Sequence, residues 1–458
     1  FGAVGMVAGT VAPDAGPLGA LPAVLGAVVG ILGMVLLLRF AVPWIAERWP
    51  GDGRESAAGT RGAVDPDPDS GTSVGADRSD RAPGAAGAAG AARPSRDDLG
   101  APGENRRKFL GLAVGSAAVA AVAWVGGRVL QEVRFRASRS RAMVKIPAPA
   151  SPAPPLPDGV DIKVPGVPPW RTSNEAFYQI DTALSVPQLD AQSWQLKIHG
   201  RVDHPRTLSF ADLLRRRLIE RDITLTCVSN PVGGSLIGNA RWIGVPLRDL
   251  LREVGVHPGA DQIVSRSSDG MTIGTPTAVV MDGRDAMLAV AMNGEPLPIK
   301  HGFPVRMVVP GLYGYVSACK WIVDMELTSF ADYDAYWVPR GYSAKAPIKT
   351  EARIDTPKQL AKIDAGTVMV GGVAWAQHRG IQRVEVQVDD GDWQEARLAA
   401  VPSTDTWRQW VYTWRARPGR HTLRVRATDD SGVTQTRREA DVAPDGATGW
   451  PYVDVTVH

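Results

Sequence analysis

The stretch of sequence that decides the fold is AMLAVAMNGEPLPIKHGFPVRMVV at 286–309. Two apolar, β-like runs, at 286–292 and 305–309, enclose a segment rich in glycine and proline, and His301 and Arg306 stand on either side of its Gly-Phe-Pro turn. A histidine and an arginine on one turn can donate hydrogen bonds to an anionic group, and arginine can do so through two parallel bonds. A lone histidine is more often structural, so the pair alone is weak support for a binding site.

A second candidate is Cys227, which ends the apolar run ITLTC at 223–227 and opens the small-residue loop VSNPVGG at 228–234. A thiol at a strand end beside such a loop can reach a bound ligand or metal. A free cysteine is more often a small buried apolar residue, and a disulfide with Cys319 is another alternative in an exported domain. The residue type alone leaves all three interpretations open.

The composition restricts the class of protein. The 458 residues are 44% hydrophobic and 22% charged, with 49 Gly, 36 Pro and 2 Cys. This length allows two or three domains with substantial cores. A net charge of +3 is too small to indicate nucleic acid as a partner. Two cysteines exclude a disulfide scaffold, a zinc ribbon and a cysteine-rich iron–sulfur site.

Two patterns of secondary structure divide the chain after residue 169. From 170 to 345, β-like runs alternate with short helical stretches, and from 350 to 458 the pattern is all β. In the first region the runs include WQLKIHG, DITLTCV and QIVSRSS, and the helical stretches are FADLLRR and PLRDLLREV. In the second region they are TVMVGGVAWA, IQRVEVQVDD, RQWVYTWRA, HTLRVRATDD and YVDVTV. We therefore predict an α+β protein, with a mixed α/β domain at 170–345 and an immunoglobulin-like β-sandwich at 350–458.

The first 145 residues have a different character and contain no histidine. Between Asp14 and Arg39 lie 24 uncharged residues, long enough to cross the ~30 Å hydrocarbon core of a bilayer as a helix. Trp44 and Trp49 follow, where interfacial aromatic residues belong. Because the first residue is Phe, we expect that 1–49 is a membrane segment whose natural N-terminus, with a further span, is missing.

A linker and a second apolar run follow. Residues 50–104 carry almost no large apolar side chains, and we predict that this linker is disordered. Within 105–145, the uncharged run at 109–127 is a mild membrane span or the apolar part of a signal. A Pro-rich connector at 146–169 then leads to the globular part.

The motif NRRKFLG at 105–111 resembles a twin-arginine export signal, which sends folded, cofactor-loaded proteins across the bacterial membrane. The alternative is that these arginines are the ordinary positive charges found on the cytoplasmic side of a membrane span. By the same rule, the five arginines between 128 and 141 favour a cytoplasmic location for the segment after the span. We expect a protein of the bacterial cell membrane whose catalytic domain lies outside the cytoplasm.

Five segments, in order, resemble the sulfite oxidase family of molybdenum enzymes. They are Phe177-Tyr178, the strand that ends in Cys227, RWIGVPLRDLL at 241–251, MNGEPLPIKHGFPVR at 292–306, and the loop that ends in Lys320-Trp321. The stretch GGVAWAQHRGIQRVEVQVDDGDW at 371–393 is also similar to the family's C-terminal dimerisation domain. The resemblance covers residues 170–458.

The resemblance implies a molybdopterin-binding domain of sulfite oxidase type, with molybdenum held by one pyranopterin dithiolene. It implies Cys227 as the thiolate ligand of the metal, and a metal would keep that sulfur ionised. His301 and Arg306 would bind the pterin and its phosphate. The other residues that the resemblance places in the pocket are Tyr178, Ser317 and Lys320, with Ser267 or Asp269 lining it.

Three departures bear on the substrate. Sulfite oxidases carry Arg-Asn-His after the aromatic pair, where this chain has Gln179-Ile180-Asp181. Their active-site tyrosine, five residues before a proline, corresponds to Met271. Val-Ser-Asn rather than Ala-Gly-Asn follows Cys227. We therefore expect oxygen-atom transfer on a small substrate that is not sulfite, with the metal carrying the hard step.

The electrons need a separate partner, which we expect to be a membrane cytochrome, a soluble carrier or the quinone pool. No histidine precedes His199, so the membrane segments cannot supply two imidazoles to a haem, and we expect no haem in this chain. The sandwich offers a surface for a homodimer. The alternative function is a cofactor-free binding or assembly module, which would have no reason to keep a metal thiolate.

Overall fold

The structure, a computed structural model, describes residues 111, 115, 119 and 136–458, and residues 136–458 belong to one compact unit. The predicted membrane segment, linker and export motif lie outside the described residues, except for Gly111, Gly115 and Val119. Among the described residues, no helix has the length and apolar character needed to cross a bilayer.

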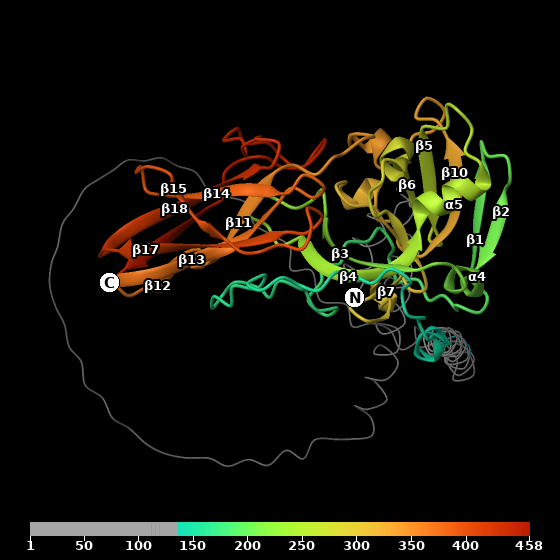
Figure 1. The fold of residues 1–458 in the computed structure, drawn as a ribbon, viewed down its shortest axis with the longest axis horizontal. Coiled ribbons are helices and arrows are strands. Elements are labelled where there is room, and N and C mark those ends of the chain that lie inside the picture. Colours follow the sequence, from blue (N-terminus) through green and yellow to red (C-terminus); the bar gives the residue numbers. More distant parts are fainter. Residues whose placement is uncertain (1–110, 112–114, 116–118, 120–135) are drawn as a thin grey trace, which may run out of the picture. The chain divides into compact units, whose positions relative to one another are not determined.

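The first region contains two five-stranded sheets (Figure 1). One has the order β2-β1-β10-β5-β6, in which β1 runs parallel to β10 and the other pairs are antiparallel. Its strands are β1 (Gln195–Gly200), β2 (Arg206–Ser209), β5 (Gln262–Ser267), β6 (Thr272–Pro276) and β10 (Ile322–Thr328). The other has the order β3-β4-β7-β8, with β9 on β7. Its strands are β3 (Ile219–Thr226), β4 (Ile237–Pro246), β7 (Met287–Met292), β8 (Glu295–Pro296) and β9 (Arg306–Val308).

The helices of this region are short, and their boundaries follow from local sequence. Ser209 caps α4 (Phe210–Leu214) by accepting from the Asp212 backbone, while the Asp212 carboxylate accepts from the Ser209 backbone. The helix α5 (Leu247–Val254) buries one apolar face and ends at Gly255, whose φ of 66° is left-handed. The remaining helices are α6 (Thr277–Met281) and the 3₁₀ turns η2 (Ile299–His301), η3 (Gly314–Val316) and η4 (Val338–Arg340).

The second region is a β-sandwich of two sheets, with strand orders β11-β13-β17-β16 and β12-β19-β18-β14-β15. The first sheet consists of β11 (Glu351–Thr356), β13 (Gly366–Trp375), β16 (Arg397–Leu398) and β17 (Arg408–Ala416). The second consists of β12 (Ala361–Ile363), β14 (Ile381–Val388), β15 (Gln394–Glu395), β18 (Gly419–Asp429) and β19 (Tyr452–Val457). Both sheets supply residues to one apolar core, which contains Trp410, Val384 and Leu423.

The strands and helices expected from the sequence are present where the runs predicted them. The run AMLAVAM is β7, all six of whose residues are buried, and VRMVV contains β9. The mostly sheet character of the protein is therefore confirmed, while the immunoglobulin-like assignment of the sandwich stays a prediction.

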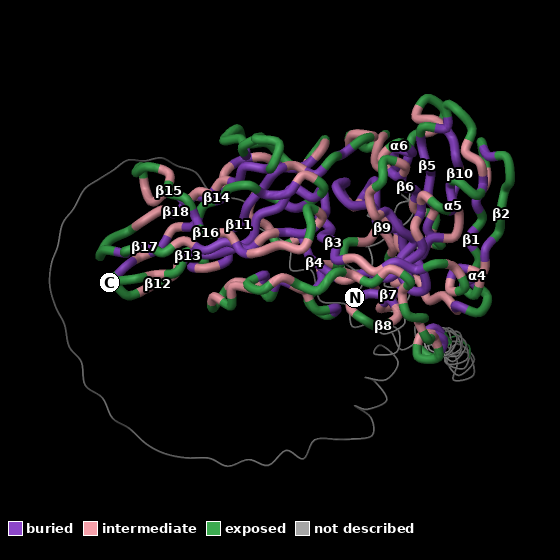
Figure 2. Tube along the Cα trace, viewed as in Figure 1, coloured by how far each residue is buried: buried purple, intermediate pink, exposed green. Residues whose placement is uncertain are grey.

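The sandwich is joined to the first region through a shared apolar core. Val373, Trp375 and Trp407 belong to the sandwich sequence, yet they pack in the large core cluster of the first region. Figure 2 shows buried segments inside both regions and exposed loops at their rims. The sandwich therefore packs against the first region near β3, the strand that leads to Cys227 (Figure 1).

Candidate active site

The strand β3 bonds to the sandwich through polar side chains and leads directly to Cys227, the predicted metal ligand. Thr224 and Thr226 are fully buried and face the sandwich, since the Thr224 hydroxyl accepts from the Trp407 backbone N–H at 2.8 Å. The Thr226 hydroxyl accepts from the Gln377 side chain at 2.9 Å. Side chains alternate along a strand, and Cys227 directly follows the last residue of β3, so we expect its side chain to lie on the face opposite that of Thr226.

The loop after Cys227 is closed by its own hydrogen bonds. The Cys227 N–H donates to Leu236 O at 3.0 Å, and the Asn230 N–H donates to Cys227 O at 3.1 Å. The Asn230 side-chain oxygen accepts from the Leu236 N–H at 2.7 Å. Both cysteines are free and buried, so the alternative of a disulfide between Cys227 and Cys319 is not realised.

Burial determines the protonation state of the Cys227 thiol. It raises the pKa of this thiol, and hydrogen bonds from Ser229 oppose the rise. The thiol is therefore protonated at neutral pH until a cation stabilises the thiolate.

Tyr178 is close to both the predicted metal ligand and the predicted anion-binding arginine. Its hydroxyl and the Thr226 carbonyl oxygen lie 3.9 and 3.6 Å from the position that a Cβ atom would occupy at Gly314. Burial and the nearby Cys227 raise the pKa of the Tyr178 phenol, whereas Arg306 lowers it. The phenol is therefore neutral at physiological pH and can donate a hydrogen bond.

His301 is a buried, neutral residue. Its Nε2 lies 2.9 Å from Asn174 O, and a carbonyl can only accept, so Nε2 carries the proton and Nδ1 is left as an acceptor. Burial, together with Arg306 and Lys300, lowers the pKa of His301 to about 4. The ring also makes an edge contact with Phe177 at 5.6 Å.

Arg306 is a buried cation without a carboxylate partner among the described residues. Its Nη1 donates to His301 O at 3.2 Å, its Nη2 lies 3.5 Å from Ala318 O, and its Nε has no partner. The guanidinium lies 5.1 Å from the Trp242 ring centroid. Burial lowers the pKa of Arg306 to about 10, which leaves it charged. Such a cation is suited to receive an anion.

Two other predicted pocket residues also have unpartnered polar atoms. The Ser267 hydroxyl, at the end of β5, and one carboxylate oxygen of Asp269 are buried without a hydrogen-bond partner. Asp269 and Arg306 both lie close enough to Cys319 to shift its pKa, in opposite directions. Because buried polar atoms are nearly always paired in native proteins, these atoms point to a missing polar ligand.

Ser317 and Lys320 are already engaged within the protein. The Ser317 hydroxyl lies 3.0 Å from both Leu312 O and Tyr313 O. The Lys320 ammonium donates to Ile180 O at 2.9 Å and pairs with the Asp181 carboxylate. Burial lowers the pKa of this ammonium to about 7. The charge of Lys320 is balanced by the Asp181 carboxylate of the chain itself.

Several residues that shape this site were not among those predicted from the sequence. They are Asn174, Asp181, Thr224, Thr226, Trp242 and Gln377. The two threonines had a signal in the sequence, because they alternate with apolar residues in the run ITLTC and so mark a second, polar face of the strand. Asp181 was recognised only as a departure from Arg-Asn-His.

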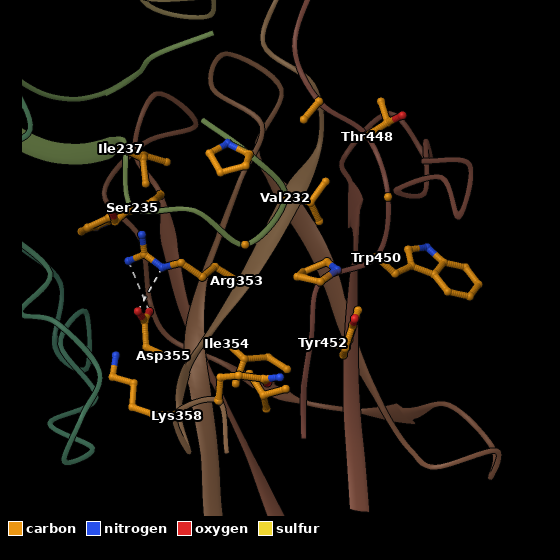
Figure 3. A pocket seen from close by; sticks show the side chains of 18 of the residues that line it. Val232, Ser235, Ile237, Arg353, Ile354, Asp355, Lys358, Thr448, Trp450 and Tyr452 are labelled. Atoms are coloured by element: carbon orange, nitrogen blue, oxygen red, sulfur yellow. Dashed lines mark hydrogen bonds and ion pairs between the residues drawn. The ribbon is translucent and has the colours of Figure 1, made fainter. Parts of the chain in front are cut away.

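A cleft of about 1100 Å³ lies on the sandwich side of the loop after Cys227 (Figure 3). Arg353 and Asp355 of β11 form a buried ion pair in its wall, with Nε 3.0 Å from Oδ1. The Arg353 Nη1 also donates to Gly234 O at 3.0 Å. The loop is therefore held both by a hydrogen bond from the sandwich, at Gly234, and by hydrogen bonds between its own residues.

Comparisons with known proteins agree with the geometry. Residues 183–337 match the family of the oxidoreductase molybdopterin binding domain. The chain is 34% identical over 177 residues to the uncharacterized oxidoreductase YuiH of Bacillus subtilis, covering 38% of this chain and 85% of that protein. It is 30% identical over 313 residues to mitochondrial sulfite oxidase of Mus musculus, covering 57% of this chain and 56% of that protein.

Among solved structures, the chain is similar to the sulfane dehydrogenase SoxCD from Paracoccus pantotrophus. The TM-score is 0.56 at 22% identity, with 64% of this chain and 84% of that chain covered, which supports the shared fold. The chain spans about half the length of the curated sulfite oxidases that it matches.

Proposed function

Because the chain belongs to the sulfite oxidase family of molybdopterin-binding oxidoreductases, we propose that it holds molybdenum through Cys227 and transfers an oxygen atom to or from a small substrate other than sulfite. The observation that carries this proposal is a free thiol at the end of β3 and a buried arginine that both act on Tyr178, where the described residues provide the arginine with no carboxylate partner.

The residues of the pocket fit a single pyranopterin dithiolene. Three buried polar groups lack partners, namely the Arg306 Nε, the Ser267 hydroxyl and one Asp269 oxygen. They would pair with the phosphate and the ring nitrogens of such a cofactor, and the His301 Nδ1 would accept from a ring N–H. When bound, the cofactor supplies a metal that exchanges an oxygen atom and two electrons with the substrate.

The chain's own contribution begins with a proton at Cys227. The thiol is protonated in the empty pocket because burial raises its pKa. It must lose this proton to become a metal ligand, so loading of the cofactor releases a proton at Sγ. The hydrogen bonds from Ser229 favour the resulting thiolate.

The charge around Lys320 supports a substrate that is not a sulfite-like oxyanion. Asp181 occupies the stretch in which sulfite oxidases carry cationic residues, and it pairs with Lys320 through side chains that are 10% and 13% exposed. A carboxylate at this place repels oxyanions and balances the neighbouring cation. We therefore place neutral acceptors, such as sulfoxides and N-oxides, ahead of sulfite as substrates.

The membrane and partner assignments rest on the sequence. We propose that the segments before residue 145 anchor the enzyme to a bacterial cell membrane, with the catalytic region outside the cytoplasm. Electrons are exchanged with a separate cytochrome, a soluble carrier or the quinone pool, and the sandwich serves as a homodimer surface.

Metal analysis of the purified full chain tests the proposal. About one molybdenum and one pterin per chain are expected, with turnover of neutral sulfoxides or N-oxides when artificial electron donors are supplied. A well-folded protein without molybdenum, purified from a host that makes the cofactor, contradicts the enzyme assignment.

The substrate assignment is tested separately with Asp181→Asn. Removing this carboxylate leaves Lys320 unbalanced, so we expect KM for anionic substrates to fall by about tenfold relative to neutral ones. Asp332→Asn, which removes the exposed partner of Arg201, is the matched control and should change neither KM. Equal behaviour of both variants contradicts the charge argument.

A further inference from the structure

We propose that Gln377, a residue of the sandwich, is a positioning residue that fixes the end of β3 and so the direction of the Cys227 side chain. Gln377 follows β13 and is fully buried. Its Nε2 donates to the Thr226 hydroxyl at 2.9 Å and to Thr224 O at 3.2 Å. The inference rests on the proposed role of Cys227 as the metal ligand.

The orientation of the Gln377 amide is fixed by its partners. A backbone carbonyl can only accept a hydrogen bond, so the nitrogen and not the oxygen of the amide must face Thr224 O. The same nitrogen then reaches the hydroxyl of Thr226, the residue directly before Cys227. The planar side-chain amide of Gln377 therefore bonds to both Thr224 and Thr226, which lie two residues apart at the end of β3.

Gln377 contacts both walls of the predicted pocket. Its backbone carbonyl oxygen lies 3.2 Å from the position that a Cβ atom would occupy at Gly311, which opens the loop that carries Ser317 and Lys320. Its side chain holds β3, which ends at the other wall. A displacement of Gln377 would therefore move the metal-ligand strand relative to the cofactor loop.

Other hydrogen bonds from the sandwich are made to β3 before Thr226, or to the loop that follows Cys227. The Thr224 N–H donates to Asp405 O at 3.0 Å, and the Trp407 N–H donates to the Thr224 hydroxyl. The Arg353 Nη1 donates to Gly234 O, seven residues after Cys227 in the sequence. Among the described sandwich residues, Gln377 makes the hydrogen bond that lies nearest in sequence to Cys227, at Thr226.

The test compares Gln377→Leu with Gln409→Leu. Gln409 is also a fully buried glutamine of the sandwich, but its amide bonds to Pro168 O and to the Ile162 N–H, in the connector. Each change removes two hydrogen bonds of one amide, so the two variants should lose similar thermal stability. Only Gln377→Leu should affect Cys227.

The first readout is the rate at which iodoacetamide modifies Cys227 in the full chain purified without molybdenum cofactor, with the Cys227 and Cys319 peptides followed separately by mass spectrometry. We expect this rate to rise roughly tenfold in Gln377→Leu, because the strand end opens more readily. Gln409→Leu should remain within about twofold of the wild type. The second readout, in loaded protein, is the Mo(V) electron paramagnetic resonance spectrum, which should change in Gln377→Leu alone.

Two results would overturn the inference. One is a Cys227 rate in Gln377→Leu within twofold of the wild type, and the other is an equal rise in both variants, which indicates general loosening. If Gln377→Leu does not fold, Thr226→Val removes the acceptor from the other side and should raise the same rate severalfold. A wild-type chain that binds no molybdenum contradicts the proposed function instead, and the modification rates still report on the strand.

Discussion

Two buried arginines show how the pocket and the sandwich differ. Arg306 in the pocket and Arg353 in the cleft wall are 5% and 9% exposed. Arg353 is paired with Asp355 and bonded to Gly234 O. Among the described residues, Arg306 contacts carbonyl oxygens and the Trp242 ring but no carboxylate.

The difference separates a structural cation from a binding cation. A buried charge is costly unless a counter-charge compensates it. At Arg353 the chain provides that counter-charge itself, so the charge contributes to folding. At Arg306 the described residues provide none, so the charge is left for a ligand. Neutral substitution should therefore reduce stability at Arg353 and cofactor binding at Arg306.

The largest effect is expected from Arg353→Met. This change leaves the Asp355 carboxyl buried alone and frees Gly234 O, so the free energy of unfolding should fall by about 3 kcal/mol. Urea denaturation measures this loss. Arg353→Met combined with Asp355→Leu should recover most of it, and a double variant as unstable as the single one contradicts the pairing.

Arg306→Met should leave the stability of the protein nearly unchanged and reduce its binding of the cofactor. Without cofactor, the free energy of unfolding should change by less than about 1 kcal/mol, since an uncompensated buried charge is replaced by an apolar side chain of similar length. Pterin retention should fall by about 10- to 100-fold, because a charge-assisted hydrogen bond is lost. Urea denaturation and pterin fluorescence after gel filtration measure the two quantities. Full pterin retention would show that Arg306 does not bind the cofactor.

The two regions should also differ in their response to acid. The pKa of His301 falls to about 4 on folding because of burial, so the unfolded state binds more protons between pH 4 and 6.5. Its contribution to stability is present above pH 6.5 and is lost as the pH falls toward 4. His301→Gln keeps a donor for Asn174 O and should remove about 1–2 kcal/mol of the difference in stability between pH 7.5 and 5. An unchanged difference contradicts a neutral buried His301.

The smallest expected effect is at His421 in the sandwich, where the sign is opposite. The hydrogen bond that the His421 ring donates to the Asp389 carboxylate raises the pKa of His421. Its contribution is present below the unfolded pKa and is lost as the pH rises through the folded pKa. The Asp389 side chain is 47% exposed, so solvent screens the pair and His421→Gln should shift the melting temperature by about 1 °C or less at pH 6. If the melting temperature at pH 6 changes as much in His421→Gln as in His301→Gln, this contrast between the two regions is wrong.

The local features of the site could be predicted from the sequence. The apolar run ITLTC is the end of β3, and the glycine- and proline-rich turn of 292–306 connects β7 to β9 as expected. These features depend on residues close together in the chain, where alternation and turn residues carry the signal. The roles of the eight pocket residues in cofactor binding stay predictions.

The contacts that hold the site in place could not be predicted. Gln377 reaches Thr226 across 151 residues, and Arg353 reaches Gly234 across 119. Asp181 meets Lys320 from the opposite end of the first region. A single sequence contains no periodicity or spacing that connects such distant partners, since they depend on how whole sheets pack.

The most direct test of the account is molybdenum coordination by the Cys227 sulfur. Purified wild-type protein should contain about one molybdenum per chain, and its X-ray absorption spectrum should show one more sulfur ligand than that of Cys227→Ser. The variant should keep its fold and its pterin but lose turnover. Identical spectra with full turnover in Cys227→Ser would contradict the account.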